Sequence, residues 1–157
     1  MRLAKASELK TIYNLFVNRR DIFPHVRRDA LKRRIESKQC IYEDGVVITF
    51  QQYKKRTHVG DLDIPAGAIM LHQILNANQF NGSAGRLFNQ FFERVVGSNG
   101  GDLYLTVRKE NKVACRFYRR HGMRIAGKVA WAGGTIPGVI YRKARAWRSR
   151  DGLDKES

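Results

Sequence analysis

The sequence has few cysteines, few acidic residues and no long apolar run, and each shortage excludes a class of protein. Two cysteines, Cys40 and Cys115, are too few for a disulfide scaffold and lack the spacing of metal ligands. We expect a reducing, cytoplasmic setting, with Cys115 as a small buried thiol. The sequence has no run of eighteen apolar residues, so no transmembrane helix is expected. Residues 1–5 lead into no apolar segment, so no signal peptide is expected either. No membrane partner and no metal are therefore expected.

Acidic side chains number 14 against 30 basic ones, which gives a formal net charge of +16 over 157 residues. The excess is uneven, with +7 over residues 1–40, −1 over residues 41–107 and +10 over residues 108–157. A charge this large attracts polyanions such as DNA or RNA. A solvated basic surface that only aids solubility is the alternative. The residues expected to contact nucleic acid are Arg27, Arg28, Arg33, Arg34, Arg116, Arg119 and Arg120.

Apolar spacing in the first forty residues predicts two amphipathic helices. Leu9, Ile12 and Phe16 mark the first, with Ser7 as its expected cap, and Leu31 and Ile35 mark the second. The basic face of the second helix can be a solvated surface or a phosphate-contacting one. Residues 40–50 then predict a hairpin around Asp44-Gly45, and residues 54–67 a polar loop.

The centre of the chain alternates strands and helices. An apolar strand over residues 68–75 leads into a glycine-rich turn at residues 79–85, and an amphipathic helix follows. A strand over residues 103–107 precedes a second helix that begins near Asn111, an expected cap. Two strands over residues 124–131 and 135–142 come next, with Pro137 indicating an edge position or a bulge in the last. The pattern predicts one α/β domain over residues 1–143 and a polar basic tail over residues 144–157.

This central stretch resembles the GNAT superfamily of acyl-CoA N-acyltransferases. Gln79-x-x-Gly82-x-Ala84 is similar to its Q/R-x-x-G-x-G/A pyrophosphate loop, and Asn111-x-x-Ala114-x-x-Phe117-Tyr118 to its second signature. A glycine-rich turn that opens a helix suits a pyrophosphate, because free amides and the helix dipole favour negative charge. The resemblance implies a GNAT-like fold with a mixed central β-sheet flanked by helices.

The resemblance also implies acetyl-CoA, or another acyl-CoA, as the co-substrate. Its pantetheine would pair with the strand before the loop, and backbone amides of the loop would hold the pyrophosphate. The residues implied in acyl-CoA binding are Ile74, Gln79, Phe80, Asn81, Gly82, Ser83, Ala84, Gly85 and Asn111.

Two residues are candidates for proton transfer. Tyr118 matches the family tyrosine that acts as general acid toward the departing thiolate, although it can also simply pack beside Phe117. His72, on the strand before the loop, can serve as the base or as a hydrogen-bonded structural histidine.

The function implied is transfer of an acetyl or other acyl group from acyl-CoA to an amine by direct attack, through a tetrahedral intermediate. The acceptor stays open, with a nucleic acid or a molecule attached to one as a candidate. Two alternatives remain: a catalytically idle GNAT fold that binds nucleic acid, and a DNA base-modification enzyme similar to the Mom family. The sequence leaves the oligomeric state open.

Overall fold

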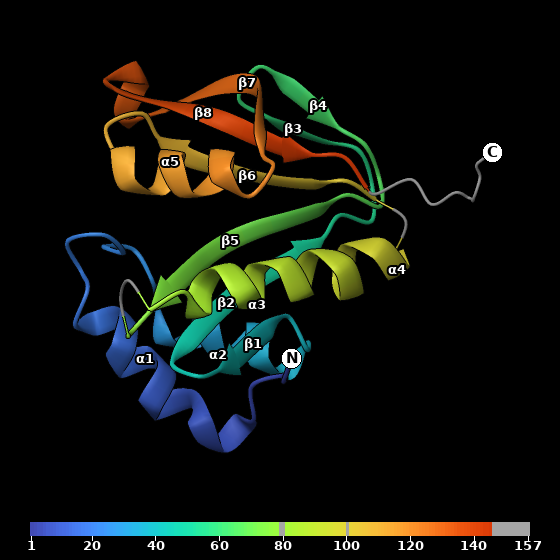
Figure 1. Cartoon of the computed structure of the whole chain (residues 1–157). Coiled ribbons are helices and arrows are strands. Elements are labelled where there is room, and N and C mark those ends of the chain that lie inside the picture. The colour runs from blue at the N-terminus through green and yellow to red at the C-terminus, as the bar shows by residue number, and fades with distance from the viewer. Residues whose placement is uncertain (79–80, 100, 146–157) are drawn as a thin grey trace. The chain divides into compact units, whose positions relative to one another are not determined.

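The computed structural model describes residues 1–78, 81–99 and 101–145 (Figure 1). The described chain is a mixed α/β structure, as the sequence predicts. It divides into two compact units, the first made of residues 1–52 and 70–91 and the second of residues 53–69 and 92 onward. The tail expected from residue 144 falls almost entirely outside the described residues and stays a prediction.

The first unit holds a sheet with the strand order β1-β2-β5, together with the N-terminal helices and α3. A short 3₁₀ turn, Ala6–Glu8, precedes α1. The elements are α1 (Leu9–Val17), α2 (Arg28–Glu36), β1 (Cys40–Glu43), β2 (Val46–Gln52), β5 (Ile69–Asn76, in this unit from Met70) and α3 (Ser83–Phe91).

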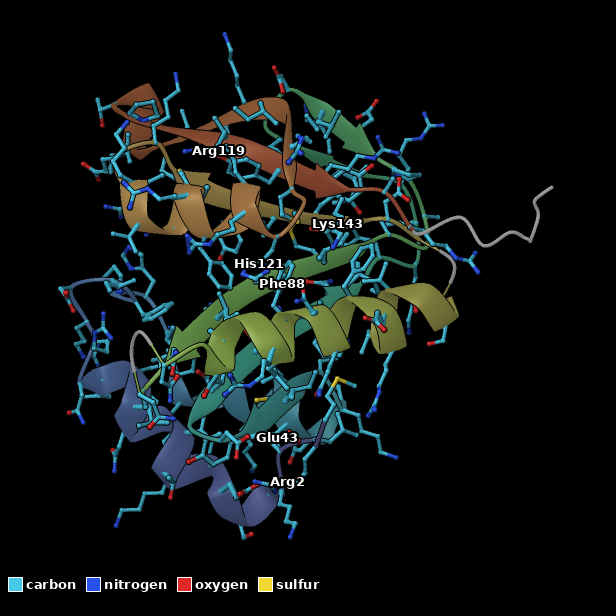
Figure 2. The ribbon with its side chains drawn as sticks, viewed as in Figure 1. Arg2, Glu43, Phe88, Arg119, His121 and Lys143 are labelled. Atoms are coloured by element: carbon cyan, nitrogen blue, oxygen red, sulfur yellow. The ribbon has the colours of Figure 1, made fainter. Side chains whose placement is uncertain are left out.

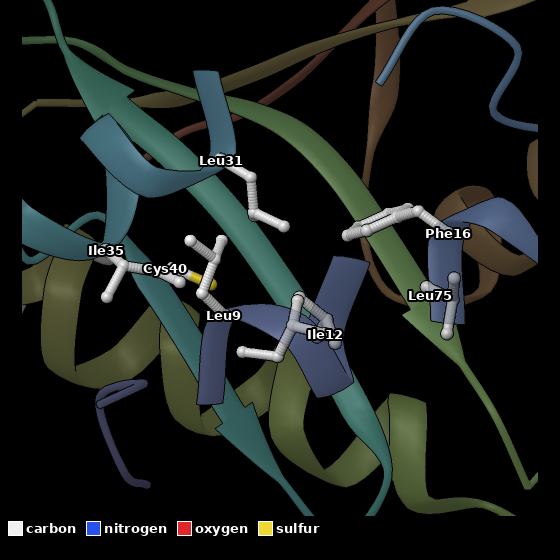
Figure 3. Close-up of a cluster of buried hydrophobic side chains, with 8 residues drawn as sticks. Leu9, Ile12, Phe16, Leu31, Ile35, Cys40 and Leu75 are labelled. Atoms are coloured by element: carbon white, nitrogen blue, oxygen red, sulfur yellow. The ribbon is translucent and has the colours of Figure 1, made fainter. Parts of the chain in front are cut away.

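Helices α1 and α2 cover one face of this sheet with a closed apolar cluster (Figure 3). Each large side chain that is withdrawn from water there contributes about 1.5–3 kcal/mol to folding. Its buried members are Leu9, Ile12, Phe16, Leu31, Ile35, Cys40, Val47 and Leu75. Both predicted helices are therefore confirmed.

Helix α3 covers the opposite face of β2. Phe50 of β2 meets Phe91 of α3 edge-on, with ring centroids 5.0 Å apart, whereas Val47 points into the α1–α2 cluster. Alternate strand residues face opposite sides, so a three-residue offset puts these two side chains on different faces. The strand over residues 68–75 and the amphipathic helix after it are thus confirmed as β5 and α3.

The predicted hairpin is present as β1 and β2, paired antiparallel with Glu43 opposite Val46. Asp44 and Gly45 connect them with positive φ angles of 53° and 74°. Two successive left-handed residues are what a two-residue turn matched to strand twist requires, and Asp-Gly supplies them at low cost.

The second unit contains a sheet with the strand order β6-β8-β7 and a separate two-stranded ribbon, β3-β4. The second chain segment of this unit begins with a π-helical turn, Phe92–Val96. Both neighbours of β8 pair with it antiparallel. The elements are β3 (Thr57–Val59), β4 (Leu62–Ile64), α4 (Gly97–Asn99), β6 (Leu103–Arg108), α5 (Lys112–Arg120), β7 (Arg124–Trp131) and β8 (Ile136–Lys143).

The prediction of a polar loop over residues 54–67 was wrong, because part of this segment forms the β3–β4 hairpin. His58 pairs with Asp63 in the ribbon, and Ile64 is fully buried. Asp61 fastens the turn to β7: its amide donates to the Lys128 carbonyl at 3.0 Å, and its carboxylate accepts from the Lys128 amide at 2.8 Å. Strands of three residues are too short to show an alternation of apolar and polar residues in the sequence. Only the hydrogen bonds between Asp61 and Lys128 of β7 reveal the hairpin.

Two smaller expectations also changed. Ser7 does not cap α1; Glu8 reaches back to accept from the Lys5 amide at 2.8 Å instead. Strand β8 is not an edge strand, because it lies between β6 and β7. Pro137 is tolerated because the β6 ladder ends at Gly138, so its absent N–H lies beyond that ladder. The pairing of β7 with β8 has one shift of register, and it falls in β7, between Ile125 and Gly127.

Among the described residues, no helix has the length and apolar character needed to cross a membrane. Within the same ranges, no three side chains of histidine, cysteine, aspartate or glutamate gather as a metal site would require.

Candidate active site

The loop before α3 combines a left-handed glycine with a helix start, a backbone arrangement typical of anion-binding turns. Gly82 adopts a φ of +82°, and the Asn81 side chain accepts from the Ser83 amide at 3.0 Å. The helical ladder begins where the Arg86 amide donates to the Gly82 carbonyl at 3.2 Å. The amides of Ala84 and Gly85 precede that bond, and helix geometry leaves such early amides without a partner in the ladder. The loop can therefore present donors and the positive end of the helix dipole to phosphates.

Gln79 and Phe80, the first two residues of the expected loop, lie outside the described residues. Of the others, Asn81 and Gly82 are exposed, Ala84 and Gly85 are half-buried, and Ser83 is buried. The exposed part of the loop is thus where a ligand could approach the backbone without a side chain in the way.

Arg86, in the first turns of α3, lies beside the loop and is a candidate that the sequence motifs did not indicate. Its guanidinium donates to Ser83 Oγ at 3.2 Å, and a Cβ added to Gly82 would lie 3.1 Å from its Nη1 atom. This puts an exposed cation over the glycine turn, where a pyrophosphate would gain from it. The available signal was its position, one helical turn after Gly82.

Strand β5 carries Ile74 and His72 into the same unit as the loop. Ile74 is half-buried, and His72 keeps an exposed surface while its Nε2 atom lies 2.8 Å from Gln51 Oε1 on β2. Surrounding protein atoms, and secondly the charge of Arg34, lower the pKa of His72 to about 4. His72 is therefore neutral at pH 7, and its environment matches the hydrogen-bonded alternative while leaving one ring nitrogen for chemistry.

Arg34 departs from its expected role on the basic surface. Its guanidinium donates inward to Gln39 Oε1 at 3.0 Å, and at 3.4 Å to the Phe50 carbonyl and Gln51 Oε1. The side chain is half-buried and ties α2 to the adjoining strand region. The Arg34 guanidinium is therefore engaged within the first unit, and a phosphate contact at Arg34 stays a prediction.

Helix α5 of the second unit carries the other candidate residues. Asn111 caps it as expected, since its side chain accepts from the Ala114 amide at 3.2 Å. Tyr118 is 7% exposed and packs near Tyr141, with ring centroids 6.1 Å apart. Burial, and secondly Cys115, raise the pKa of Tyr118 well above its ordinary value of 10. Its phenol holds its proton at neutral pH and can act as a hydrogen-bond donor.

The arginines of α5 expected to contact nucleic acid, Arg116, Arg119 and Arg120, are exposed. Arg119, labelled in Figure 2, also donates to Tyr141 Oη at 3.1 Å, so part of its donor capacity is used within the unit. Cys115 is a buried free thiol, which confirms the expectation for it.

Comparison with known proteins gives the fold. The chain is similar over 94% of its length to the loading GNATL domain of CurA from Lyngbya majuscula, with 13% identity, 98% of that chain covered and a TM-score of 0.74. It is similar over 91% of its length to a GNAT-family acetyltransferase from Bacillus cereus, with 16% identity, 94% of that chain covered and a TM-score of 0.67.

Arabidopsis thaliana NAA60 in complex with a bisubstrate analogue gives a TM-score of 0.66 at 16% identity, over 91% of this chain and 96% of that one. The fold is GNAT-like. No family model and no curated protein matches the sequence. The fold expectation is therefore confirmed, while the site residues stay predictions.

Proposed function

We propose that this protein transfers an acyl group from acyl-CoA to an amine. The observation that carries the proposal is the turn at Gly82, which opens α3 with early amides and the Arg86 cation, on a chain with a GNAT-like fold. Another structure of Arabidopsis thaliana NAA60, with a TM-score of 0.62, contains acetyl-CoA, which fits the same choice of co-substrate.

Acyl-CoA is the donor substrate in this proposal. The pyrophosphate is assigned to the backbone of Asn81–Gly85 and to Arg86, the pantetheine to β5 near Ile74, with Asn111 as a further contact. A thioester supplies an activated carbonyl, so the protein's main task is to hold donor and amine together. The nitrogen–carbonyl bond forms, the carbon–sulfur bond breaks, the amine loses a proton and the sulfur gains one.

Tyr118 and His72 are proposed for those two protons. Burial raises the pKa of Tyr118, so the phenol is protonated at neutral pH and has a proton to give to the departing sulfur; the phenolate left behind regains its proton readily. His72 is unprotonated at pH 7 and is an acceptor of low basicity. The low pKa makes His72 the weaker of the two proposals.

A polyanionic acceptor, DNA or RNA or a molecule attached to one, is the finer part of the proposal. The support is the net charge of +16 and the exposed positions of Arg27, Arg28 and Arg33 on the first unit and of Arg116, Arg119 and Arg120 on the second. The idle nucleic-acid binder and the DNA base-modification enzyme stay alternatives, because the same exposed arginines would serve either of them and none separates them from the acyltransferase.

The test is calorimetric titration of acetyl-CoA into the wild type, Gly82→Glu and Gly82→Asn. Asparagine tolerates the left-handed backbone better than most residues and adds no charge, so it controls for strain at φ +82°. We expect glutamate to weaken binding at least about tenfold, by bulk and repulsion, and asparagine to weaken it much less. Absence of binding to the wild type would reject the proposed function and favour the idle binder.

A further inference from the structure

The first unit has an open depression of about 800 Å³ where the end of α1 meets the start of α2. It is lined by Tyr13 of α1, by the segment between the two helices and by the first turns of α2. It is separate from the Gly82 loop, and none of its lining residues belongs to the proposed chemistry. The lining residues are Tyr13, Arg20, Pro24, His25, Val26, Arg27, Arg28, Asp29 and Lys32.

The lining is strongly cationic. Four arginine and lysine side chains face a single carboxylate, that of Asp29. Asp29 is already engaged by Arg27 at 3.2 Å and, from outside the depression, by Arg33 at 3.6 Å. The hydrogen bond from Arg27 is the main influence that lowers the pKa of Asp29, so the carboxylate stays ionised and paired with these two cations.

Three cations are left to act on a ligand. Arg28 has no side-chain ion pair or hydrogen bond among the described residues. Lys32 has only a long ion pair to Glu36, at 3.9 Å between exposed groups, which is weak in water. Arg20 is steadied by donation to Tyr13 Oη at 3.3 Å, a neutral partner that leaves its charge uncompensated. These groups suit an anion with several acceptor oxygens, since guanidinium matches phosphate geometry.

The lining is not charged throughout. Tyr13 and Val26 are half-buried and pack against the apolar cluster of the first unit. Pro24, two residues before Val26, is exposed. A tyrosine ring and a proline ring give surfaces on which a sugar or a base can lie. Cations beside such rings are typical of nucleic-acid grooves, in which backbone charge and base stacking are satisfied together.

We propose that this depression binds a phosphate and the adjoining nucleotide of a nucleic-acid strand. A strand is favoured over a free nucleotide because a further basic side chain lies past the depression on α2: Arg33 is 69% exposed, and its ion pair with the exposed Asp29, at 3.6 Å, is weak in water. The excess of basic over acidic residues in the whole chain also exceeds what one phosphate needs. The site deepens the polyanionic part of the proposed function, which already names Arg27 and Arg28, but it does not depend on acyl transfer: RNA binding and acetyl-CoA binding are measured separately, so either can fail alone.

The experiment measures the fluorescence anisotropy of a labelled 20-nucleotide single-stranded RNA between about 0.05 and 0.3 M salt. The test variant is Arg28→Glu/Lys32→Glu, which reverses two lining charges at exposed positions. The control variant is Lys10→Glu/Lys38→Glu, two exposed lysines of the same unit that do not line the depression. Both variants change the net charge equally, and circular dichroism checks that both stay folded.

We expect the wild type to bind at about 0.15 M salt, a typical physiological ionic strength. The test variant should bind at least about tenfold more weakly, with a log–log salt slope smaller by about 1.4, because each single-strand contact contributes about 0.7. The control variant should stay within about threefold of the wild type. Competition by adenosine monophosphate should need far higher concentrations than competition by unlabelled RNA.

Three outcomes overturn the proposal. Equal weakening in both variants assigns the binding to overall charge and not to the depression. Absence of wild-type binding at 0.15 M salt rejects the site as a nucleic-acid contact. Competition by adenosine monophosphate at the RNA's own concentration rejects the strand and makes the ligand a free nucleotide.

Discussion

Gln51 fixes which ring nitrogen of His72 carries the proton. The Oε1 atom of Gln51 lies 2.8 Å from His72 Nε2 and also accepts from Arg34 Nη2 at 3.4 Å. A guanidinium has donors only, so the atom it contacts must be the carbonyl oxygen. His72 therefore donates through Nε2–H, and its Nδ1 atom holds the lone pair. Any proton that His72 accepts must arrive at Nδ1.

His72 is predicted to titrate well below its ordinary pKa of 6.5, near 4. The folded state then binds fewer protons than the unfolded state between these values, so stability falls as pH drops from about 6.5 to about 4. Urea unfolding of wild type and His72→Gln at several pH values measures this. The wild type should lose stability relative to the variant across that window.

A direct check is the histidine titration followed by nuclear magnetic resonance. Replacing Arg34 with methionine removes a cation that lowers the pKa of His72, so the midpoint should move upward. The nitrogen shifts should report the Nε2–H tautomer at pH 7. A midpoint near or above 6.5 in the wild type would contradict the environment described for this side chain.

Tyr118→Phe is predicted to slow acyl transfer by about ten- to a thousandfold, since general acid catalysis typically contributes 10²–10⁴. The change keeps the buried ring and removes only the donor, so the acetyl-CoA dissociation constant should barely move. Steady-state rates with a thiol reporter, beside calorimetry, separate the two effects. Cys115→Ser, a nearby buried change on the same helix, controls for local disturbance of α5. Full turnover in Tyr118→Phe would remove this residue from the mechanism.

Gly60→Ala is predicted to destabilise the second unit more than Gly67→Ala does. Both glycines have positive φ angles, +56° and +91°, so both substitutions carry backbone strain of about 1–2 kcal/mol. Only at Gly60 would the new Cβ run into the Lys128 carbonyl, whereas at Gly67 it meets nothing within 4 Å. Overpacking adds about 1–3 kcal/mol where backbone cannot yield. Chemical denaturation of the two variants gives the comparison, and equal losses would show that β7 yields at Lys128.

Local sequence chemistry determined much of this fold because its signals act between near neighbours. The turn at Asp44-Gly45 needs two left-handed residues and has the pair that best allows them. The Asn111 cap acts within three residues of itself, on Ala114. The apolar stripe of α1 is fixed by helical period alone. Such features could be predicted before any long-range contact was known.

Tertiary structure decided the features that depend on distant partners. The β3–β4 hairpin has strands too short to show a period, and Asp61 reveals it only by bonding to Lys128. Arg34 shares the α2 sequence pattern with the exposed Arg33, yet the acceptors on Gln39 and β2 draw it inward. The pKa of His72 likewise follows from its surroundings and from Arg34, since desolvation and charge act through space and not along the chain.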